Sequence, residues 1–156
     1  MTFVEAMRIL SAFERHGVAY VLVGSMAMAA QGIVRATRDI DVFVAADESN
    51  IARLKAALRE VFDDPEIEHI TAADLEGEYP AIQYVPPESD YWIDILARLG
   101  EAFRYAEVES EVVQIEGISV RVATPRMLYR MKRDTVRPQD RADAELLKQR
   151  FGLEDN

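Results

Sequence analysis

The pattern of apolar spacing, helix-forming residues and capping residues predicts five helices along the chain. In the first of these segments, Met7, Leu10 and Phe13 repeat every three or four residues, which is the spacing of one buried helix face. Thr2 and Glu5 stand at the two positions of a capping box, which begins a helix. The predicted helices cover residues 2–16, 26–32, 47 to about 62, 124 to about 132, and 138 to about 152.

Short apolar or alternating runs between these segments predict strands. They cover residues 19–23, 39–44, 67–70, 81–85, 90–96, 109–115 and 118–122, and Gly117 stands at a hairpin turn between the last two. Several strands follow one another with no helix between them, so we expect an α/β (α+β) fold in which helices flank a mixed, twisted sheet. Residues 1–156 are expected to form one domain, with a helix and sheet core over 1–122 and a C-terminal helical segment over 123–152.

Composition supports an ordinary folded domain. Hydrophobic residues make up 49% and charged residues 29% of the 156 positions, which is enough apolar surface to form a core. The chain has no cysteine, which excludes disulfides, thiolate metal sites and cysteine nucleophiles. The longest apolar run is too short to span a bilayer, so we expect a soluble, cytoplasmic protein with no membrane partner.

Charge is distributed unevenly along the chain. The formal net charge is −10, and residues 1–120 hold 9 Lys and Arg against 22 Asp and Glu. Residues 121–150 reverse this balance, with 9 basic and 4 acidic side chains. The acidic body argues against a nucleic-acid-binding module, whereas the basic segment is suited to contact phosphate groups locally.

The tripeptide Asp39-Ile40-Asp41 is the first candidate for chemistry. Side chains at i and i+2 of a strand point the same way, with α-carbons roughly 6.5 to 7 Å apart. Two carboxylates so placed suit a hard divalent cation such as Mg²⁺, and a pair of such ions can hold both reacting oxygens of a phosphoryl transfer. The alternative is an ordinary solvated strand face.

Asp94 adds a third carboxylate. It lies inside the apolar strand "YWIDILARL", with Trp92 and Leu96 on its own face, where a charge needs a partner or a cation. If this strand lies beside residues 39–44, three carboxylates converge, and Asp94 is then a metal ligand or a general base. A salt bridge to one of the arginines is the alternative.

Gly24-Ser25 lies between a predicted strand and a predicted helix. Glycine allows the backbone to approach a ligand closely, and amides at a helix N-terminus favour an anion such as a triphosphate. Alternatively, Ser25 is a routine helix N-cap. Arg35 and Arg38 flank the acidic tripeptide, where they are suited to neutralise it or to contact a phosphate.

In combination, these motifs resemble the nucleotidyltransferase superfamily of the DNA polymerase β type. That superfamily has Gly-Gly/Ser, a spacer, Asp-x-Asp and a third acid on a later strand. The thirteen residues between Ser25 and Asp39 are similar to the spacer of the AbiEii/AbiGii toxin group and of the small lincosamide-type antibiotic nucleotidyltransferases. The segment "MKRDTVRPQDRADAELL" resembles the C-terminal helix motif of that group, so the resemblance covers about residues 18 to 150.

The resemblance implies a nucleotidyltransferase fold and a role for each matching residue. Asp39 and Asp41 would hold Mg²⁺, and Asp94 would be the third catalytic acid and metal ligand. The residues implied around the nucleotide are Gly24, Ser25, Lys132, Arg137, Asp140 and Asp143. For the last four, the alternative is that Lys132 and Arg137 are exposed and that the two acids interact with the helix dipole.

The expected function is a magnesium-dependent nucleotidyltransferase, with one or two Mg²⁺ ions as cofactor. It would transfer a nucleoside monophosphate from an NTP to an acceptor hydroxyl and release pyrophosphate. The acceptor would be a small molecule, a protein or an RNA 3′ end. If the protein belongs to a toxin–antitoxin pair, an antitoxin or toxin would be its partner. The alternative is a catalytically silent protein of the same fold that acts as a partner-binding component of such a pair.

Overall fold

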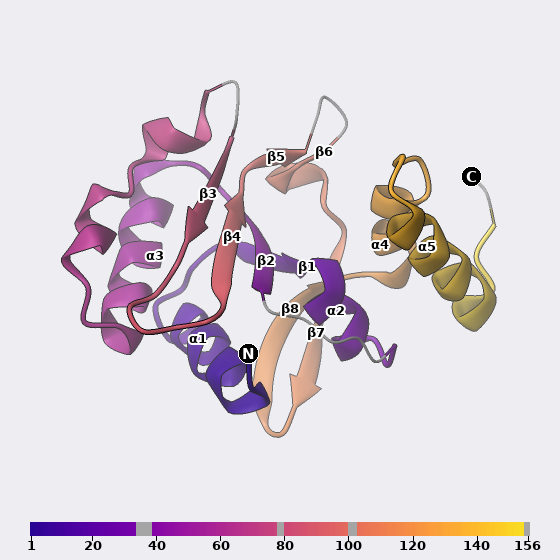
Figure 1. The fold of residues 1–156 in the computed structure, drawn as a ribbon, viewed down its shortest axis with the longest axis horizontal. Coiled ribbons are helices and arrows are strands. Elements are labelled where there is room, and N and C mark those ends of the chain that lie inside the picture. Colours follow the sequence, from indigo (N-terminus) through magenta and orange to yellow (C-terminus); the bar gives the residue numbers. More distant parts are fainter. Residues whose placement is uncertain (34–38, 78–79, 100–102, 155–156) are drawn as a thin grey trace.

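The computed structural model describes residues 1–33, 39–77, 80–99 and 103–154 (Figure 1). The α-helices are α1 (Phe3–Arg15), α2 (Gly24–Ala30), α3 (Glu48–Val61), α4 (Pro125–Lys132) and α5 (Pro138–Phe151). The strands are β1 (Tyr20–Val23), β2 (Asp39–Val44), β3 (Ala81–Tyr84), β4 (Trp92–Leu96), β5 (Arg98–Leu99), β6 (Phe103–Arg104), β7 (Ser110–Ile115) and β8 (Ile118–Ala123). Short 3₁₀ turns are η1 (Pro65–His69), η2 (Ala72–Leu75) and η3 (Tyr105–Glu107).

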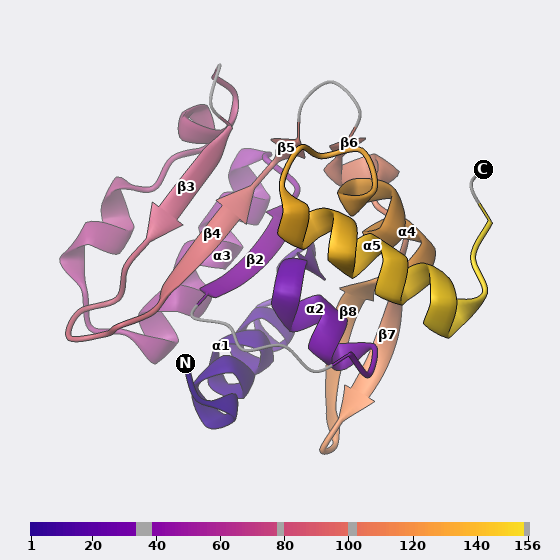
Figure 2. The same cartoon turned by 45° about the vertical axis from the view of Figure 1, so that its right-hand side comes forward.

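Six strands form one mixed sheet in the order β3-β4-β2-β1-β8-β7. β2 runs parallel to β4 and β1 parallel to β8, while the other neighbours are antiparallel. Helices α1 and α3 pack behind the sheet as seen in Figure 1, and α2, α4 and α5 lie on the opposite side (Figure 2). The predicted mixed α/β architecture is therefore confirmed.

Side-chain caps fix where the main helices begin. Thr2 and Glu5 form the predicted capping box of α1, with Thr2 N donating to Glu5 Oε2 over 2.7 Å. Asp47 accepts the amide of Asn50 at the start of α3 over 2.8 Å, and Thr124 accepts the amide of Met127 at the start of α4 over 3.1 Å. Each cap satisfies an amide that the first helical turn leaves without a partner.

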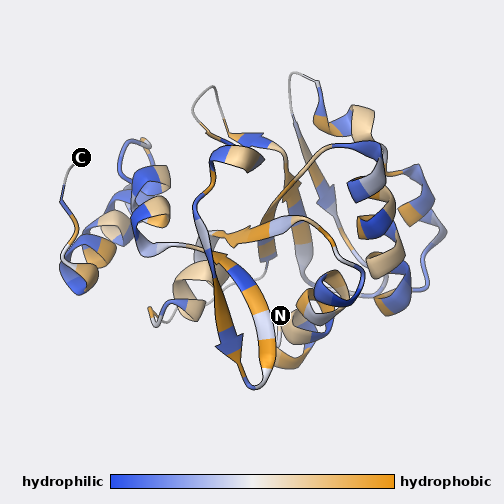
Figure 3. Cartoon of the chain, turned by 180° about the vertical axis from the view of Figure 1, so that it is seen from behind, coloured by the Kyte–Doolittle hydropathy of each residue, from blue (hydrophilic) through white to orange (hydrophobic). Residues whose placement is uncertain are grey.

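The core lies between the sheet and the helices α1 and α3. Phe13 of α1, Leu54 of α3 and Ile93 of β4 are fully buried there. Viewed from the side of these helices, hydrophobic and hydrophilic residues alternate along α1 and α3, as expected for helices with one buried face (Figure 3). Within the described residues, no helix has the length and apolar character needed to cross a bilayer.

Two local predictions are wrong. Residues 67–69, where a strand was expected, belong to the 3₁₀ turn η1. This turn begins at Pro65, and the Asp64 side chain caps it by accepting a hydrogen bond from the amide of Glu66 over 3.0 Å. Ser25 is not a helix N-cap, because α2 begins one residue earlier and Val23 occupies the cap position without a side-chain bond. The hairpin of β5 and β6 was not predicted, because two-residue strands are too short to give a hydrophobic pattern.

Candidate functional site

The parallel pairing of β2 with β4 brings three acidic side chains together. Asp41 is the register partner of Asp94, and Asp39 lies two residues before Asp41 on the same face of β2. One carboxylate oxygen from each of Asp39, Asp41 and Asp94 lies within 4.8 Å of the others. We refer to these three residues as the carboxylate triad; all of them are half-buried.

The triad is electrostatically unfavourable without a cation. Burial first, and then the charge of Asp39 and the neighbouring Asp94, together raise the pKa of Asp41 to about 8. Burial also raises the pKa of Asp94, although the indole Nε1 of Trp92 donates to Asp94 Oδ2 over 3.0 Å and opposes the shift. A set of convergent carboxylate oxygens is what Mg²⁺ prefers, so the triad fits a divalent metal.

Gly24 is positioned directly against the triad. Its φ of +71° lies in the left-handed region, which favours glycine. A Cβ added at this position would lie 3.0 Å from Asp41 Cγ and closer still to Asp41 Oδ2. The absence of a Cβ at Gly24 therefore makes room for the Asp41 carboxylate.

A cleft of about 370 Å³ adjoins the triad on the side of α4 and α5. Five residues predicted from the sequence line it together: Gly24, Asp41, Lys132, Arg137 and Asp140. Its apolar walls include Phe43, Leu96, Leu99, Leu128, Met131 and Val136. The cleft therefore combines charged groups with apolar surface next to the carboxylates, as small-molecule sites commonly do.

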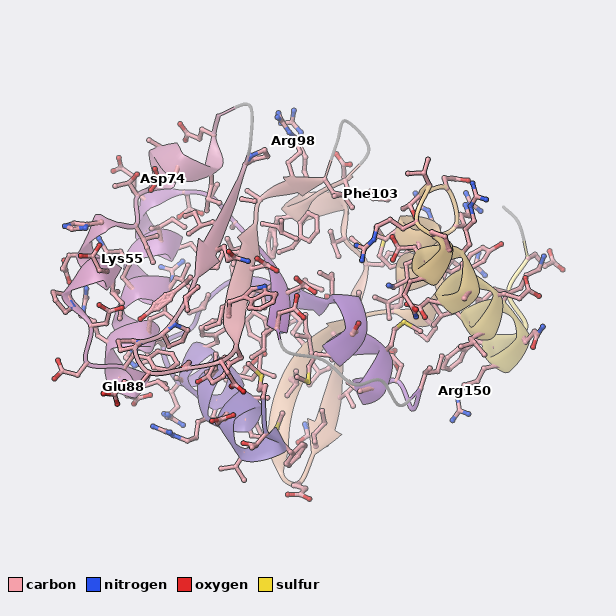
Figure 4. The ribbon with its side chains drawn as sticks, viewed as in Figure 1. Lys55, Asp74, Glu88, Arg98, Phe103 and Arg150 are labelled. Atoms are coloured by element: carbon pink, nitrogen blue, oxygen red, sulfur yellow. The ribbon has the colours of Figure 1, made fainter. Side chains whose placement is uncertain are left out.

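The hairpin of β5 and β6 contacts α4 beside the cleft. Phe103 of β6 lies toward α4 (Figure 4), and the guanidinium of Arg130 sits 5.9 Å from the centre of the Phe103 ring. This contact is within the range of a cation–π interaction. Leu99 of β5 lines the cleft, and no motif in the sequence pointed to this residue.

Lys132 is held by two acids of the following helix. Its Nζ lies 3.1 Å from Asp143 Oδ2 and 3.4 Å from Asp140 Oδ1, and its side chain is only 12% exposed. Asp143 also accepts from Gln139 Nε2 over 3.1 Å, and Thr135 Oγ1 donates to Asp140 Oδ2 over 2.9 Å. Lys132 is therefore an anchored cation at the cleft wall, contrary to the alternative that it is exposed.

The other predicted residues are less closely tied to the cleft. Arg137 lines it with a side chain that is 74% exposed, and its Nε lies 3.9 Å from Asp140 Oδ2. Ser25 follows Gly24 in the first turn of α2 and is half-buried. Arg35 and Arg38 lie outside the described residues.

Comparison with known proteins agrees with this geometry. The model of a family described as "Nucleotidyl transferase AbiEii toxin, Type IV TA system" matches residues 8–147. The chain belongs to the AbiEii family. The predicted relationship is therefore confirmed, and the family assignment makes this AbiEii protein a nucleotidyltransferase. No curated protein matches the chain in sequence.

Solved structures share the fold of this AbiEii protein at low sequence identity. The lincosamide antibiotic adenylyltransferase LnuA, determined with lincomycin, aligns with a TM-score of 0.60 at 15% identity over 95% of this chain and 97% of its own. The complex of ANT(2″)-Ia with adenylyl-2″-tobramycin gives 0.58 at 16% identity over 97% and 91%. A protein from Thermotoga maritima assigned as a nucleotidyltransferase gives 0.57 at 17% identity over 97% and 96%.

Proposed function

We propose that this AbiEii protein transfers a nucleoside monophosphate from an NTP to an acceptor hydroxyl and releases pyrophosphate. The observation that carries the proposal is the carboxylate triad, whose oxygens lie within 4.8 Å of one another beside a cleft walled by Lys132. Such a triad suits Mg²⁺, which when bound would neutralise phosphate charge and polarise the reacting phosphorus. Asp39, Asp41 and Asp94 are the residues that would hold it.

The residues of the chain have complementary tasks in this proposal. Lys132 and Arg137 offer positive charge to the phosphates from the α4–α5 side of the cleft, and Asp140 holds Lys132 in place. Gly24 and Ser25 border the phosphates at the start of α2, and Arg38 is proposed to reach the same groups. Asp94 accepts the proton of the attacking hydroxyl. A hydrogen bond of 3.0 Å from the indole Nε1 of Trp92 holds the Asp94 carboxylate in position for this step.

The acceptor is a small molecule, a protein or an RNA 3′ end. Two of the similar structures are complexes with lincomycin and with adenylyl-2″-tobramycin, which favours a small molecule, whereas the family description names a toxin. A toxin role for this chain implies an antitoxin partner. The intact triad favours an active enzyme over a catalytically silent binding component.

Binding measurements test the nucleotide and metal assignments. Titration calorimetry with ATP, GTP, CTP and UTP in the presence of Mg²⁺ should show binding of at least one nucleotide by the wild-type protein. The double variant Asp39→Asn/Asp41→Asn should lose this binding, while Asp63→Asn, which changes an exposed acid elsewhere, should keep it. Retained affinity in the double variant would remove the metal assignment.

Label transfer tests turnover and identifies the class of acceptor. Incubation of the protein with α-³²P-labelled NTPs and a cell lysate should place label in the small-molecule, protein or RNA fraction. The Asp94→Asn variant should lose that label while still binding NTP, because it lacks the proposed base. Absence of label in every fraction, with NTP bound, would favour the silent binding component.

A further inference from the structure

The carboxylate triad has two different surroundings along the strands that carry it. Leu96, two residues after Asp94, lines the cleft that holds Lys132. Trp92, two residues before Asp94, lies on the same face at the opposite end of β4 and is the register partner of Asp39. Asp94 therefore stands between the cleft on one side and Trp92 on the other.

The described residues leave the sheet beyond Trp92 uncovered on the triad side. Among the described residues, no helix lies over β3 and β4 on the side that faces the viewer in Figures 1 and 2. Gln83 of β3 is the register partner of Asp94, and it is exposed. Val85, which follows β3, is 55% exposed. We refer to the surface formed by Trp92, Gln83 and Val85 as the open face.

The indole N–H of Trp92 holds the ring in place within this surface by a hydrogen bond. The indole Nε1 donates to Asp94 Oδ2 over 3.0 Å, so the orientation of the ring is tied to that of the proposed base. The side chain is only half-buried, and the ring therefore still offers apolar surface to a ligand. It is the single tryptophan of the chain.

The geometry of phosphoryl transfer assigns the two sides of the triad to the two substrates. The attacking and leaving oxygens lie roughly in line on opposite sides of phosphorus. The leaving pyrophosphate needs cations, which Lys132 and Arg137 provide in the cleft. The attacking hydroxyl must then approach Asp94 from the opposite side, which is the side of Trp92.

We propose that the open face is the acceptor subsite and that a hydroxyl-bearing ring of the acceptor stacks on Trp92. This inference rests on the proposed function. The acceptor oxygen forms a bond to the α-phosphorus as the bond to pyrophosphate breaks, and the hydroxyl proton passes to Asp94. The Gln83 amide lies beside Asp94 and supplies a donor or acceptor for a polar group of the ring.

The groups of the open face narrow the class of ring. Trp92 offers an aromatic face for stacking, and the Gln83 amide offers one donor group and one acceptor group, so both suit an uncharged ligand. The ring that stacks on Trp92 is therefore an uncharged sugar or base, as in a glycoside or a nucleoside.

Two substitutions of Trp92 separate ring stacking from the hydrogen bond to Asp94. Trp92→Phe and Trp92→Ala both lose the indole N–H, so any effect that acts through Asp94 is common to the two variants. Only Trp92→Phe keeps an aromatic ring. Val112→Ala, which alters an exposed residue on the distant edge strand β7, is the control for a general loss of stability.

The first measurement is pyrophosphate release from the preferred NTP as a function of probe concentration. The probes are adenosine, cytidine and methyl glucoside, so that base and sugar rings are compared. Stacking of one ring on an aromatic side chain corresponds to a change in affinity of about 5- to 150-fold. Trp92→Ala should raise the KM of the active probe by this factor relative to Trp92→Phe, with similar kcat in the two variants.

The second measurement uses the fluorescence of Trp92, which has no background from another tryptophan. A saturable change on adding the active probe to wild-type protein with Mg²⁺ and α,β-methylene ATP would support contact at the open face. Equal probe KM for Trp92→Ala and Trp92→Phe, or no fluorescence response to any probe while the nucleotide binds, overturns the inference alone. Failure of wild-type protein to bind any NTP overturns the proposed function with it.

Discussion

Substitution of Gly24 by alanine should damage the metal site as well as the fold. Gly17 offers a matched control, because its φ of +66° is close to the +71° of Gly24. A Cβ at Gly17 would find its nearest neighbour, Arg53 Cδ, at 3.9 Å, which is an ordinary contact. A Cβ at Gly24 would lie 3.0 Å from Asp41 Cγ, so the Asp41 carboxylate must move away.

The two variants share one cost and differ in the other. Placing a non-glycine residue in the left-handed region costs about 1–2 kcal/mol. For a chain of this size, 1 kcal/mol lowers the Tm by roughly 2–4 °C, so Gly17→Ala should lower it by about 2–8 °C. Gly24→Ala pays the same strain and in addition displaces Asp41 from Asp39 and Asp94.

The assay is thermal unfolding with and without Mg²⁺ or Mn²⁺. A ligand at a concentration of 100 times its Kd stabilises the native state by about 2.7 kcal/mol, and tenfold weaker binding removes about 1.4 kcal/mol of this. Gly17→Ala should therefore keep the full metal-dependent rise in Tm, and Gly24→Ala should lose at least half of it. An equal metal-dependent rise in the two variants would refute the reasoning.

Three further predictions concern charge and burial. Because burial, together with the neighbouring Asp39 and Asp94, raises the pKa of Asp41 to about 8 from 3.8, the native state holds this proton more tightly than the unfolded chain. The Tm of metal-free protein should therefore fall as pH rises between these values, and Asp41→Asn should flatten this dependence in thermal scans. Lys132→Met should lower the free energy of unfolding by about 3–5 kcal/mol, because the buried Asp143 carboxylate then loses the Lys132 ammonium. Lys132→Met/Asp143→Leu should recover most of this loss, as measured by urea titration. Asn50→Ala should lower the free energy of unfolding by on the order of 3 kcal/mol, because the fully buried Asn50 side chain forms hydrogen bonds with three backbone groups of Ala19 and Ala45. A loss below about 0.5 kcal/mol would contradict that role.

The triad was predictable from the sequence because it depends on strand periodicity. Alternation in "DIDVFV" places Asp39 and Asp41 on one face, and alternation in "YWIDIL" places Asp94 with Trp92. The local pattern does not show whether these two strands are neighbours, because they are separated by about fifty residues along the chain. The structure shows that β2 pairs with β4 and that Asp41 stands opposite Asp94.

The error at residues 67–70 has a local physical cause. Ile67 and Ile70 are both buried, and in a 3₁₀ helix side chains three residues apart project in the same direction. In a strand, residues three apart would point to opposite faces, so the spacing of Ile67 and Ile70 favours the 3₁₀ turn over the predicted strand. The cap by Asp64 and the Pro65 that follows were the available signals for a helical turn.

The setting of Lys132 could not be read from the sequence. Its partners Asp140 and Asp143 lie beyond the turn that joins α4 to α5, so the ion pairs form only when these helices pack together. Of the nine basic residues in 121–150, Lys132 and Arg137 line the cleft among the described residues. Charge summed along the segment therefore overstated the positive charge that faces the site.

The balance of charge around the cleft explains why the metal and the nucleotide belong together. Asp140 and Asp143 already balance Lys132, and among the described residues that line the cleft Arg137 is the other cation, itself 3.9 Å from Asp140 Oδ2. Without a divalent cation, the acids among the described residues outnumber the bases there, and their field repels a triphosphate. A cation held by the triad reverses this field, because a bound metal is the largest local charge in such a site. The acidity of the chain is thus compatible with a phosphate-bearing substrate that arrives as its metal complex.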